Sequence, residues 1–551
     1  MKSIFSLLLI AFALWMQPLA AQNLSAEKLS AEFDRILSAE YKADGPGCTA
    51  LVAQNGKIIY QKAFGMANIE LDVPMRPEMV FRIGSISKQF TAIAILQLLE
   101  QGKLSLQDPI TKYVPDYPMH GYTITLEHLL THTSGIKNYT DMEEFGKIMR
   151  NDMTPEEMIA FFKNQPMDFA PGSAWNYSNS GYFLLGYVIE KVSGKTYPEY
   201  VEELIFKPLG MKNSLYGDDA KLIKNRAAGY QGGENGPQNA LVLSMTLPYA
   251  AGSLQSTVGD LFIWHQALHA GKLVKKETLQ KAFTEYKLSN GEGAHYGYGW
   301  FLGDLQGSAT IEHSGGINGF LTDAVYLPAQ DVFVAVFSNS EAKDPGTPAT
   351  KIAAWAIGKP YSYKEMSLSE QQQQEYTGVY ETESGEQRII SIEKGVLYSR
   401  RTGGSPFVIR AYEKDKFFFD ESLATLEFKR EGKQIVQVIS SQRNSPTLVW
   451  KKTDKPIPVQ KEVSIGEKEL AAYVGRYELA PTFSITITQE GGRLFAQATG
   501  QGKNEVFAEK PDRFFFKVVD AQIGFFKNAA GQVDRMILYQ NGQEMPGKKV
   551  Q

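Results

Sequence analysis

The C-terminal half of the chain contains an internal repeat. The segment EYTGVYE at 375–381 returns as YVGRYE at 473–478, and the triplet Phe417–Phe419 returns as Phe514–Phe516. Both matches have the same offset of 97 residues, which is hard to obtain by chance. Because short strand patterns and turn residues fill both copies, the repeat predicts two homologous all-β domains, each similar to a small barrel or sandwich. These domains are expected at about 368–455 and 465–551.

The region before the repeat, 22–360, mixes strand and helix patterns. CTALVAQNGKIIYQKAFG predicts two strands joined at Asn55-Gly56, a dipeptide suited to a tight hairpin turn. Helices are expected at 86–100 and at 181–193, where Gly194 marks the end. Strands are also predicted at the C-terminal end of the region, in ATIEHSGG, LTDAVYLP and DVFVAVFSNS. Strands at both ends with helices between them predict one α+β domain whose sheet is built by both termini of the region.

The N-terminus has the pattern of a secretory signal peptide over residues 1–21. Lys2 precedes an apolar run from Ile4 to about Trp15, and small residues lead to an expected cleavage site near Ala21. That run is too short for a lasting membrane span, and no later stretch approaches the ~20 apolar residues that a span needs. We therefore expect an exported protein, periplasmic or extracellular, without stable membrane insertion.

Composition narrows the classes of partner. The chain has 57 basic and 61 acidic residues, well mixed along its length, which disfavours nucleic acid and anionic membrane surfaces as partners. Cys48 is the only cysteine, so no disulfide can form within the chain. The oligomeric state cannot be read from these features.

Ser85 and Lys88 form the strongest candidate for chemistry. Five Ser-x-x-Lys matches occur in the chain, but only this one combines a preceding glycine, Gly84, with a long apolar helix pattern, QFTAIAILQLLEQG. Residues three apart on a helix share a face, so the lysine can reach the serine oxygen. A serine becomes a good nucleophile when a neighbouring base takes its proton. For an isolated match, a capping serine beside a solvated lysine would be the simpler interpretation.

Two further segments support the chemical interpretation. PGSAWNYSNSGYFLLG places Tyr177 and Asn179 just before a helix, and EHSGGINGF places His313-Ser314-Gly315 on a strand. With these motifs in order, the chain resembles the serine β-lactamase and penicillin-binding-protein superfamily. It is most similar to the branch of class C β-lactamases, D-Ala-D-Ala carboxypeptidases and D-aminopeptidases, peptidase family S12. Two further segments also resemble sequences of this family: LEHLLTHTSGI and AAGSLQSTVGDLFIW. The resemblance covers about residues 30–355.

The resemblance implies a role for each matching residue. Ser85 would be the acylated nucleophile, and Lys88 and Tyr177 its acid–base partners. Asn179 would hold the amide of the substrate, and the strand of His313, Ser314 and Gly315 would bind its backbone and carboxylate. The backbone N–H groups of Ser85 and Gly316 would form the oxyanion hole. It also implies a β-lactamase-like fold, followed by two lipocalin-like barrels as in related D-aminopeptidases.

His313 departs from the Lys-Thr-Gly motif of many relatives. A lysine would be a fixed positive charge, whereas an unperturbed histidine changes charge near pH ~6.5. We therefore expect affinity for carboxylate-bearing substrates to fall as the pH rises through that region. This departure favours D-aminopeptidase-like chemistry over efficient β-lactam hydrolysis.

Other motifs have simpler interpretations. His128/His132 and His265/His269 are four residues apart, but neither pair has the glutamate of the zinc-protease motif, so capping or surface roles are expected. No cofactor and no metal are expected. The sequence thus predicts an exported serine hydrolase that forms a Ser85 acyl-enzyme with D-amino-acid peptides or related amides. A β-lactamase, a promiscuous esterase and a non-catalytic ligand-binding protein remain alternatives.

Overall fold

The structure is a computed structural model that describes most of the chain. It covers residues 25–550 with gaps at 234–235, 421, 444, 446, 459–461, 481–482 and 541–542. The predicted signal peptide lies outside the described residues. Within the described ranges, no helix has both the length and the apolar content that a membrane crossing requires.

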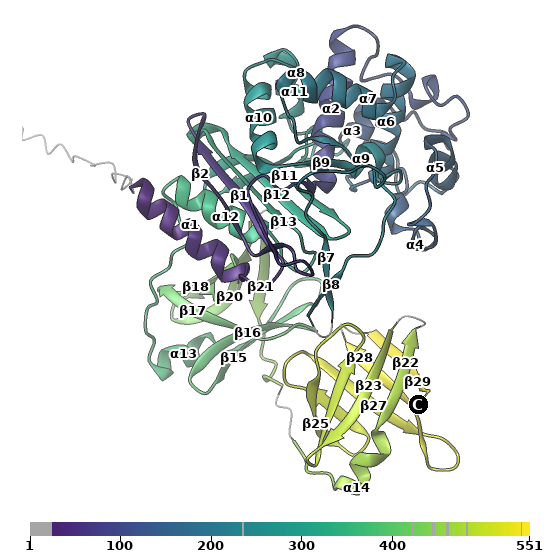
Figure 1. The fold of residues 1–551 in the computed structure, drawn as a ribbon. Coiled ribbons are helices and arrows are strands. Elements are labelled where there is room, and N and C mark those ends of the chain that lie inside the picture. The colour runs from purple at the N-terminus through teal and green to yellow at the C-terminus, as the bar shows by residue number, and fades with distance from the viewer. Residues whose placement is uncertain are drawn as a thin grey trace, which may run out of the picture.

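A six-stranded antiparallel sheet forms the centre of the N-terminal domain (Figure 1). Its strands lie in the order β10 (Phe301–Leu305), β11 (Ser308–Ile317), β12 (Phe320–Leu327), β13 (Val332–Ser338), β1 (Cys48–Gln54) and β2 (Lys57–Phe64). The β1–β2 turn places Asn55 and Gly56 at φ values of 50° and 71°, as a tight hairpin requires. The predicted sheet, built by both ends of this region, is therefore confirmed.

The two faces of the sheet are covered by different helices. Along β1, Ala50 and Val52 pack with α1 (Ala26–Glu40) and α12 (Gly346–Ala356). Leu51 and Ala53 alternate with them and belong to the larger core on the other face, as the period of a strand dictates. The helical layer on that face comprises α2 (Ser87–Glu100), α3 (Leu126–Leu130), α5 (Pro155–Phe162), α6 (Asn179–Ser193), α7 (Tyr197–Val201), α9 (Tyr249–Gly252), α10 (Val258–His269) and α11 (Lys276–Ala282).

Both copies of the repeat fold as closed eight-stranded barrels, so the predicted β-lactamase-like domain followed by two all-β domains is confirmed. Barrel 1 contains β14 (Gly378–Glu381), β15 (Gln387–Glu393), β16 (Val396–Arg401), β17 (Phe407–Glu413), β18 (Lys416–Phe419), β19 (Thr425–Glu431), β20 (Gln434–Ser441) and β21 (Leu448–Lys452). Barrel 2 contains β22 (Gly475–Ala480), β23 (Phe483–Glu490), β24 (Arg493–Ala498), β25 (Asn504–Lys510), β26 (Arg513–Phe516), β27 (Ala521–Lys527), β28 (Val533–Gln540) and β29 (Gln543–Lys549).

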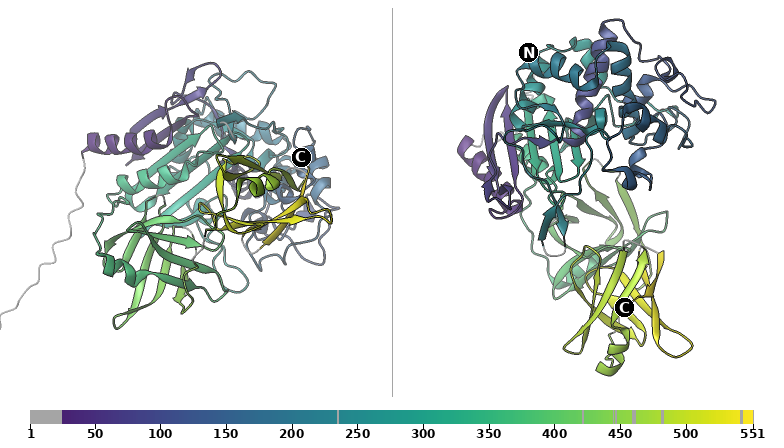
Figure 2. Two further views of the ribbon diagram at one scale, coloured as in Figure 1. Left: turned by 90° about the horizontal axis from the view of Figure 1, so that it is seen from below. Right: turned by 45° about the vertical axis from the view of Figure 1, so that its right-hand side comes forward.

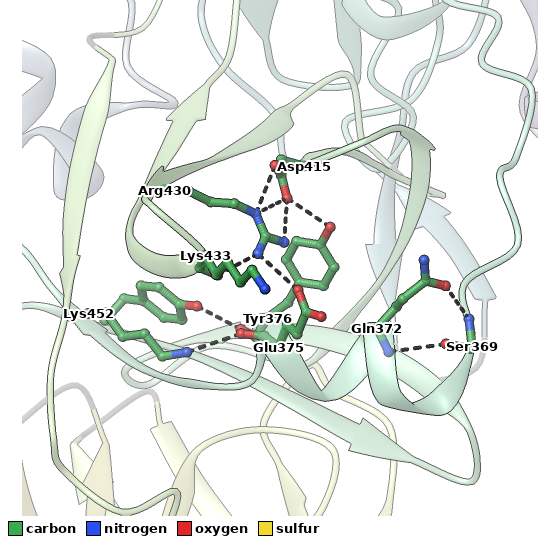
Figure 3. A network of polar contacts seen from close by, with 9 residues as sticks. Ser369, Gln372, Glu375, Tyr376, Asp415, Arg430, Lys433 and Lys452 are labelled. Carbon is green, nitrogen blue, oxygen red and sulfur yellow. Dashed lines mark hydrogen bonds and ion pairs between the residues drawn. The ribbon is translucent and has the colours of Figure 1, made fainter.

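Equivalent residues of the two barrels make the same contacts. In barrel 1, the helix α13 (Glu370–Tyr376) closes one end, where the Tyr376 hydroxyl donates to Asp415 at 2.9 Å (Figure 3). In barrel 2, the Tyr473 hydroxyl donates to Asp512, also at 2.9 Å. All four positions obey the offset of 97 residues, as do Phe417 and Phe514, whose side chains are buried in the two cores. The first and last residues of each aromatic triplet therefore serve the barrel cores.

The other end of barrel 1 faces the N-terminal domain (Figures 1 and 2). The β20–β21 connection carries Arg443, which donates to the carbonyl of Asp304 on β10 and forms an ion pair with Glu312 on β11. At the same end, the connection between β16 and β17 carries Gly403, whose backbone N–H donates to Asp520 of barrel 2. One end of barrel 1 thus contacts both other domains, and it reaches the strand that carries the His313 motif.

Candidate active site

Ser85 lies in a short 3-10 turn, η1 (Gly84–Ile86), that leads directly into α2. The sequence predicts a helix from residue 86, and α2 begins one residue later, at Ser87. Gly84 has φ 50°, and a Cβ there would lie 2.9 Å from the nitrogen of Gly316 on β11. Glycine therefore permits this turn to pass close to the strand, which brings the backbone N–H groups of Ser85 and Gly316 to neighbouring positions.

Lys88 is fully buried beneath Ser85. Its Nζ lies 2.9 Å from Ser85 Oγ, 2.8 Å from Asn179 Oδ1 and 2.9 Å from the carbonyl oxygen of Ala251. Burial lowers the pKa of Lys88 well below its usual value, because no carboxylate compensates for the lost hydration. A neutral amine donates two hydrogens, which suit the two carbonyl acceptors, and its lone pair then faces the serine hydroxyl.

Tyr177 packs beside both groups. Lys88 Nζ lies 4.7 Å from the centre of the Tyr177 ring, and the phenol is within hydrogen-bonding reach of Ser85. Burial raises the pKa of Tyr177, while the Ser85 hydroxyl lowers it by a smaller amount. The tyrosine is therefore a neutral phenol at ordinary pH, able to donate a proton but poorly suited to accept one.

Asn179 begins α6 and connects Lys88 to a neighbouring loop. Its backbone N–H donates to Asn138 Oδ1 at 3.0 Å, and its Nδ2 donates to Thr140 at 3.3 Å. Ser178 caps the helix by accepting from the backbone of Gly181. Because the cap and the loop fix the backbone, the Asn179 amide keeps its oxygen toward Lys88.

The strand β11 passes next to Ser85. Gly315 permits this approach, because a Cβ there would meet the carbonyl oxygen of Ile83 at 2.1 Å. His313 is buried on the side of Tyr177, whereas Ser314 is exposed. The structure thus brings together all the predicted site residues, although they come from three distant segments of the chain.

His313 differs from the sequence-based expectation in one respect. It is 1% exposed, and its Nδ1 donates to the Ser314 carbonyl at 2.6 Å while its Nε2 accepts from the Tyr296 hydroxyl at 2.9 Å. Burial, with Lys88 as a second cause, lowers the pKa of His313 to about 3. The expected change of charge near pH ~6.5 is therefore wrong, because the imidazole stays neutral far below that pH.

We expect the His313 ring to show no titration between about pH 5 and pH 8, since its pKa in the folded protein lies below the unperturbed value of ~6.5. Over that window the ring keeps its proton on Nδ1. Long-range ¹H–¹⁵N spectra of histidine-labelled protein, assigned by comparison with His313→Gln, provide the measurement. A midpoint for His313 near pH ~6.5 would contradict this account of the site.

The sequence missed the residues behind the site. His132 is buried, with its ring centre 4.3 Å from that of Tyr177, and its Nδ1 accepts from the Ser178 backbone at 3.1 Å. Tyr296 fixes His313, and Phe301 lies 5.1 Å from the His313 ring. His132 does lie in LEHLLTHTSGI, a segment that resembles the family. No motif in the sequence identifies Tyr296 or Phe301 as site residues.

The expected capping or surface roles hold for one of the four paired histidines. His128 completes the capping box of α3. His132 packs under the site, and His265 and His269 lie within 4.6 Å of the Tyr326 ring, measured between ring centres, in a small aromatic cavity of about 20 Å³. These three side chains pack against other aromatic rings, from the turn after α3 for His132 and from α10 for His265 and His269.

Comparisons with known proteins agree with this geometry. Residues 33–359 match the family described as Beta-lactamase, and residues 459–549 match a domain of unknown function, DUF3471. A penicillin-binding protein of Bacillus subtilis (strain 168) is 27% identical over 404 residues, which is 69% of this chain and 89% of that protein.

Two solved structures resemble the chain. The octameric penicillin-binding protein homologue from Pyrococcus abyssi has a TM-score of 0.56 and 30% identity, covering 78% of this chain and 100% of that one. The D-stereospecific amidohydrolase from Streptomyces sp. has a TM-score of 0.52 and 28% identity, covering 60% and 98%. The family match spans more than half of the chain and contains Ser85, Lys88, Tyr177 and His313. The chain therefore belongs to the Beta-lactamase family and is a serine hydrolase.

Proposed function

We propose that the protein hydrolyses amides and peptides that contain D-amino acids, through an acyl-enzyme on Ser85. The observation that carries this proposal is the buried amine of Lys88, which lies 2.9 Å from the Ser85 oxygen and whose pKa is lowered by burial. A neutral amine at 2.9 Å is in position to act as a general base for the serine. We also propose that the reaction takes place outside the cytoplasm, because of the signal-peptide pattern at residues 1–21.

The first half of the reaction forms the acyl-enzyme. Lys88 takes the proton of Ser85 while Oγ attacks the carbonyl carbon of the substrate. The negative oxygen that develops accepts hydrogen bonds from the backbone N–H groups of Ser85 and Gly316. The C–N bond then breaks as the Tyr177 phenol gives its proton to the leaving nitrogen. Lys88, now protonated, returns a proton to Tyr177.

The second half releases the product. Water attacks the acyl carbon, gives its proton to Lys88, and the serine leaves with a proton returned along the same route. Asn179 keeps Lys88 oriented throughout, because its amide oxygen accepts from Nζ. Neutral His313 supplies no fixed charge to bind a carboxylate, which supports a preference for amides over β-lactams.

A substrate panel tests this proposal. We expect kcat/KM for D-alanine p-nitroanilide to exceed that for the L-enantiomer, and that for nitrocefin, by about 10- to 100-fold, the scale on which binding pockets discriminate similar substrates. The D-stereospecific amidohydrolase in the same fold is the reason to choose D-substrates. Short-chain p-nitrophenyl esters form the parallel arm. Faster turnover of nitrocefin or of the esters would assign the site to a β-lactamase or an esterase instead.

A further inference from the structure

Barrel 1 carries a buried arginine at a position where barrel 2 carries an isoleucine. Arg388 on β15 pairs with Tyr380 on β14. Ile485 on β23 pairs with Tyr477 on β22, and both positions differ from those of barrel 1 by the offset of 97 residues. Arg388 is 5% exposed, and Ile390 on the same strand belongs to the apolar core of the barrel. Because residues two apart in a strand share a face, the Arg388 side chain points into the barrel.

The residues that contact Arg388 inside barrel 1 are also polar. Its guanidinium donates from Nη1 to Ser399 on β16 at 2.7 Å and from Nη2 to Ser440 on β20 at 3.4 Å. The equivalent strand positions in barrel 2 are Ala496 and Leu538, which are both buried in its core. Apolar residues can therefore fill this layer of the fold, so the barrel itself does not require the arginine.

The charge of Arg388 is not paired. Its hydrogen bonds to described residues reach the two serine hydroxyls, and its Nε has no partner among those residues. Two of the five donors of the guanidinium are thus in use. Burial, with Arg401 as a second cause, lowers the pKa of Arg388 to about 10, so the group is still charged at neutral pH. Buried charges are normally paired, because an unpaired one loses its hydration without compensation.

The charges around Trp450 on β21 do not balance. Its ring centre lies 4.8 Å from Cζ of Arg388 and 5.5 Å from Cζ of Arg401. Glu386 forms an ion pair with Arg401, whose side chain is 48% exposed. One carboxylate therefore accompanies two guanidinium groups, and the more deeply buried of the two lacks a counter-ion.

Solvent reaches the inner face of barrel 1 close to Arg388. This arginine is the second residue of β15, so it lies near the β14–β15 connection, at the end of the barrel opposite to α13. Phe407 on β17 pairs with Ser399 and therefore lies on the same inner face, yet it is 42% exposed. An exposed aromatic ring beside a buried, unpaired arginine suits a ligand that joins an anionic group to an apolar one.

We propose that barrel 1 binds a small carboxylate at this end, with the carboxylate held by Arg388 and an apolar substituent packed against Phe407. A carboxylate accepts two parallel hydrogen bonds from a guanidinium, and the free Nε with a neighbouring Nη can supply them. A free carboxylic acid and the C-terminus of a peptide share this chemistry. The inference stands independently of the reaction proposed above, because no residue of the Ser85 site takes part in it.

Calorimetric titration of the full-length protein tests the inference. Phenylacetate is the probe, and phenylacetamide is its neutral match of similar shape. Phenylacetate should bind at least about tenfold more tightly, the scale on which a charge-assisted hydrogen bond contributes. Arg388→Ile introduces the residue that barrel 2 carries at this position and should abolish the preference. N-Acetylglycyl-phenylalanine and its C-terminal amide repeat the comparison for a peptide, so the pair that shows a preference identifies the source of the carboxylate.

A matched variant and a stability measurement complete the test. Arg400→Ile removes the same charge from the outer face of β16, since residue 400 alternates with Ser399, and should leave the preference unchanged. Phenylacetate should raise the melting temperature of the wild-type protein but not that of Arg388→Ile. If Arg388→Ile does not fold, Arg388→Lys should bind phenylacetate about tenfold more weakly than the wild type, because an ammonium lacks the planar pair of donors. Equal affinity for the acid and the amide in both pairs, or a preference that persists in Arg388→Ile, would overturn the inference.

Discussion

Ser85→Ala should lose covalent labelling and reduce turnover by about 10⁴- to 10⁶-fold, the scale seen when a serine hydrolase loses its nucleophile. The reason is structural, because the Lys88 amine lies 2.9 Å from the Ser85 oxygen and burial lowers the pKa of that amine well below its usual value. A fluorophosphonate probe, followed by mass spectrometry of the peptide that contains Ser85, gives the site of labelling. Steady-state kinetics with D-alanine p-nitroanilide gives the rate.

Ser87→Ala is the matched control. Ser87 lies two residues further on, where its hydroxyl accepts from the backbone of Leu254 at 3.1 Å, so it is buried in the structure and does not face Lys88. Its replacement should leave labelling at Ser85 in place. Labelling that persists in Ser85→Ala would show that another residue is the nucleophile.

Lys88→Ala and Tyr177→Phe should each reduce kcat by at least ~10²-fold, the usual scale for an acid–base group. The double variant should be little worse than the poorer single variant, because the two groups pass the same proton. Lys88→Arg should not restore activity, since a guanidinium stays protonated and cannot act as a base.

The pH profile gives a second measurement on Lys88. The base must be neutral to act, so kcat/KM should rise with pH through the pKa of Lys88 in the free enzyme. Because burial lowers that pKa, the ascending limb should lie well below the usual value of 10.5. A double variant that loses the full product of the two single losses would instead mean that Lys88 and Tyr177 act independently.

The sequence predicted those parts of the fold that local patterns encode. The offset of 97 residues predicted two homologous all-β domains. The repeat can be recognised in the sequence partly because Gly378 and Gly475 have φ values of 146° and 149°, which favour glycine at both positions. The hairpin at Asn55-Gly56 and the helix end at Gly194 could also be predicted, because the residues that favour a turn or a helix cap lie within the turn or cap itself.

The sequence could not predict contacts that depend on tertiary packing. The low pKa of His313 comes from its burial and from nearby Lys88, and neither follows from the local motif His313-Ser314-Gly315. Arg443 and Glu312 are 131 residues apart and belong to different domains. Residue types indicated the chemistry of the site, whereas its pKa values and its contacts between domains depend on which segments fold against it.

The pairing of β1 with β13 has a consequence for how the chain is made. Cys48 pairs with Ser338, 290 residues later in the chain. At ~5–20 residues per second, the ribosome needs roughly 15–60 s to synthesise the intervening segment. During that interval the β1–β2 hairpin has an open edge that includes the apolar run Leu51-Val52-Ala53. This edge is therefore the place where a newly made chain is most exposed to pairing with another copy before its own sheet closes.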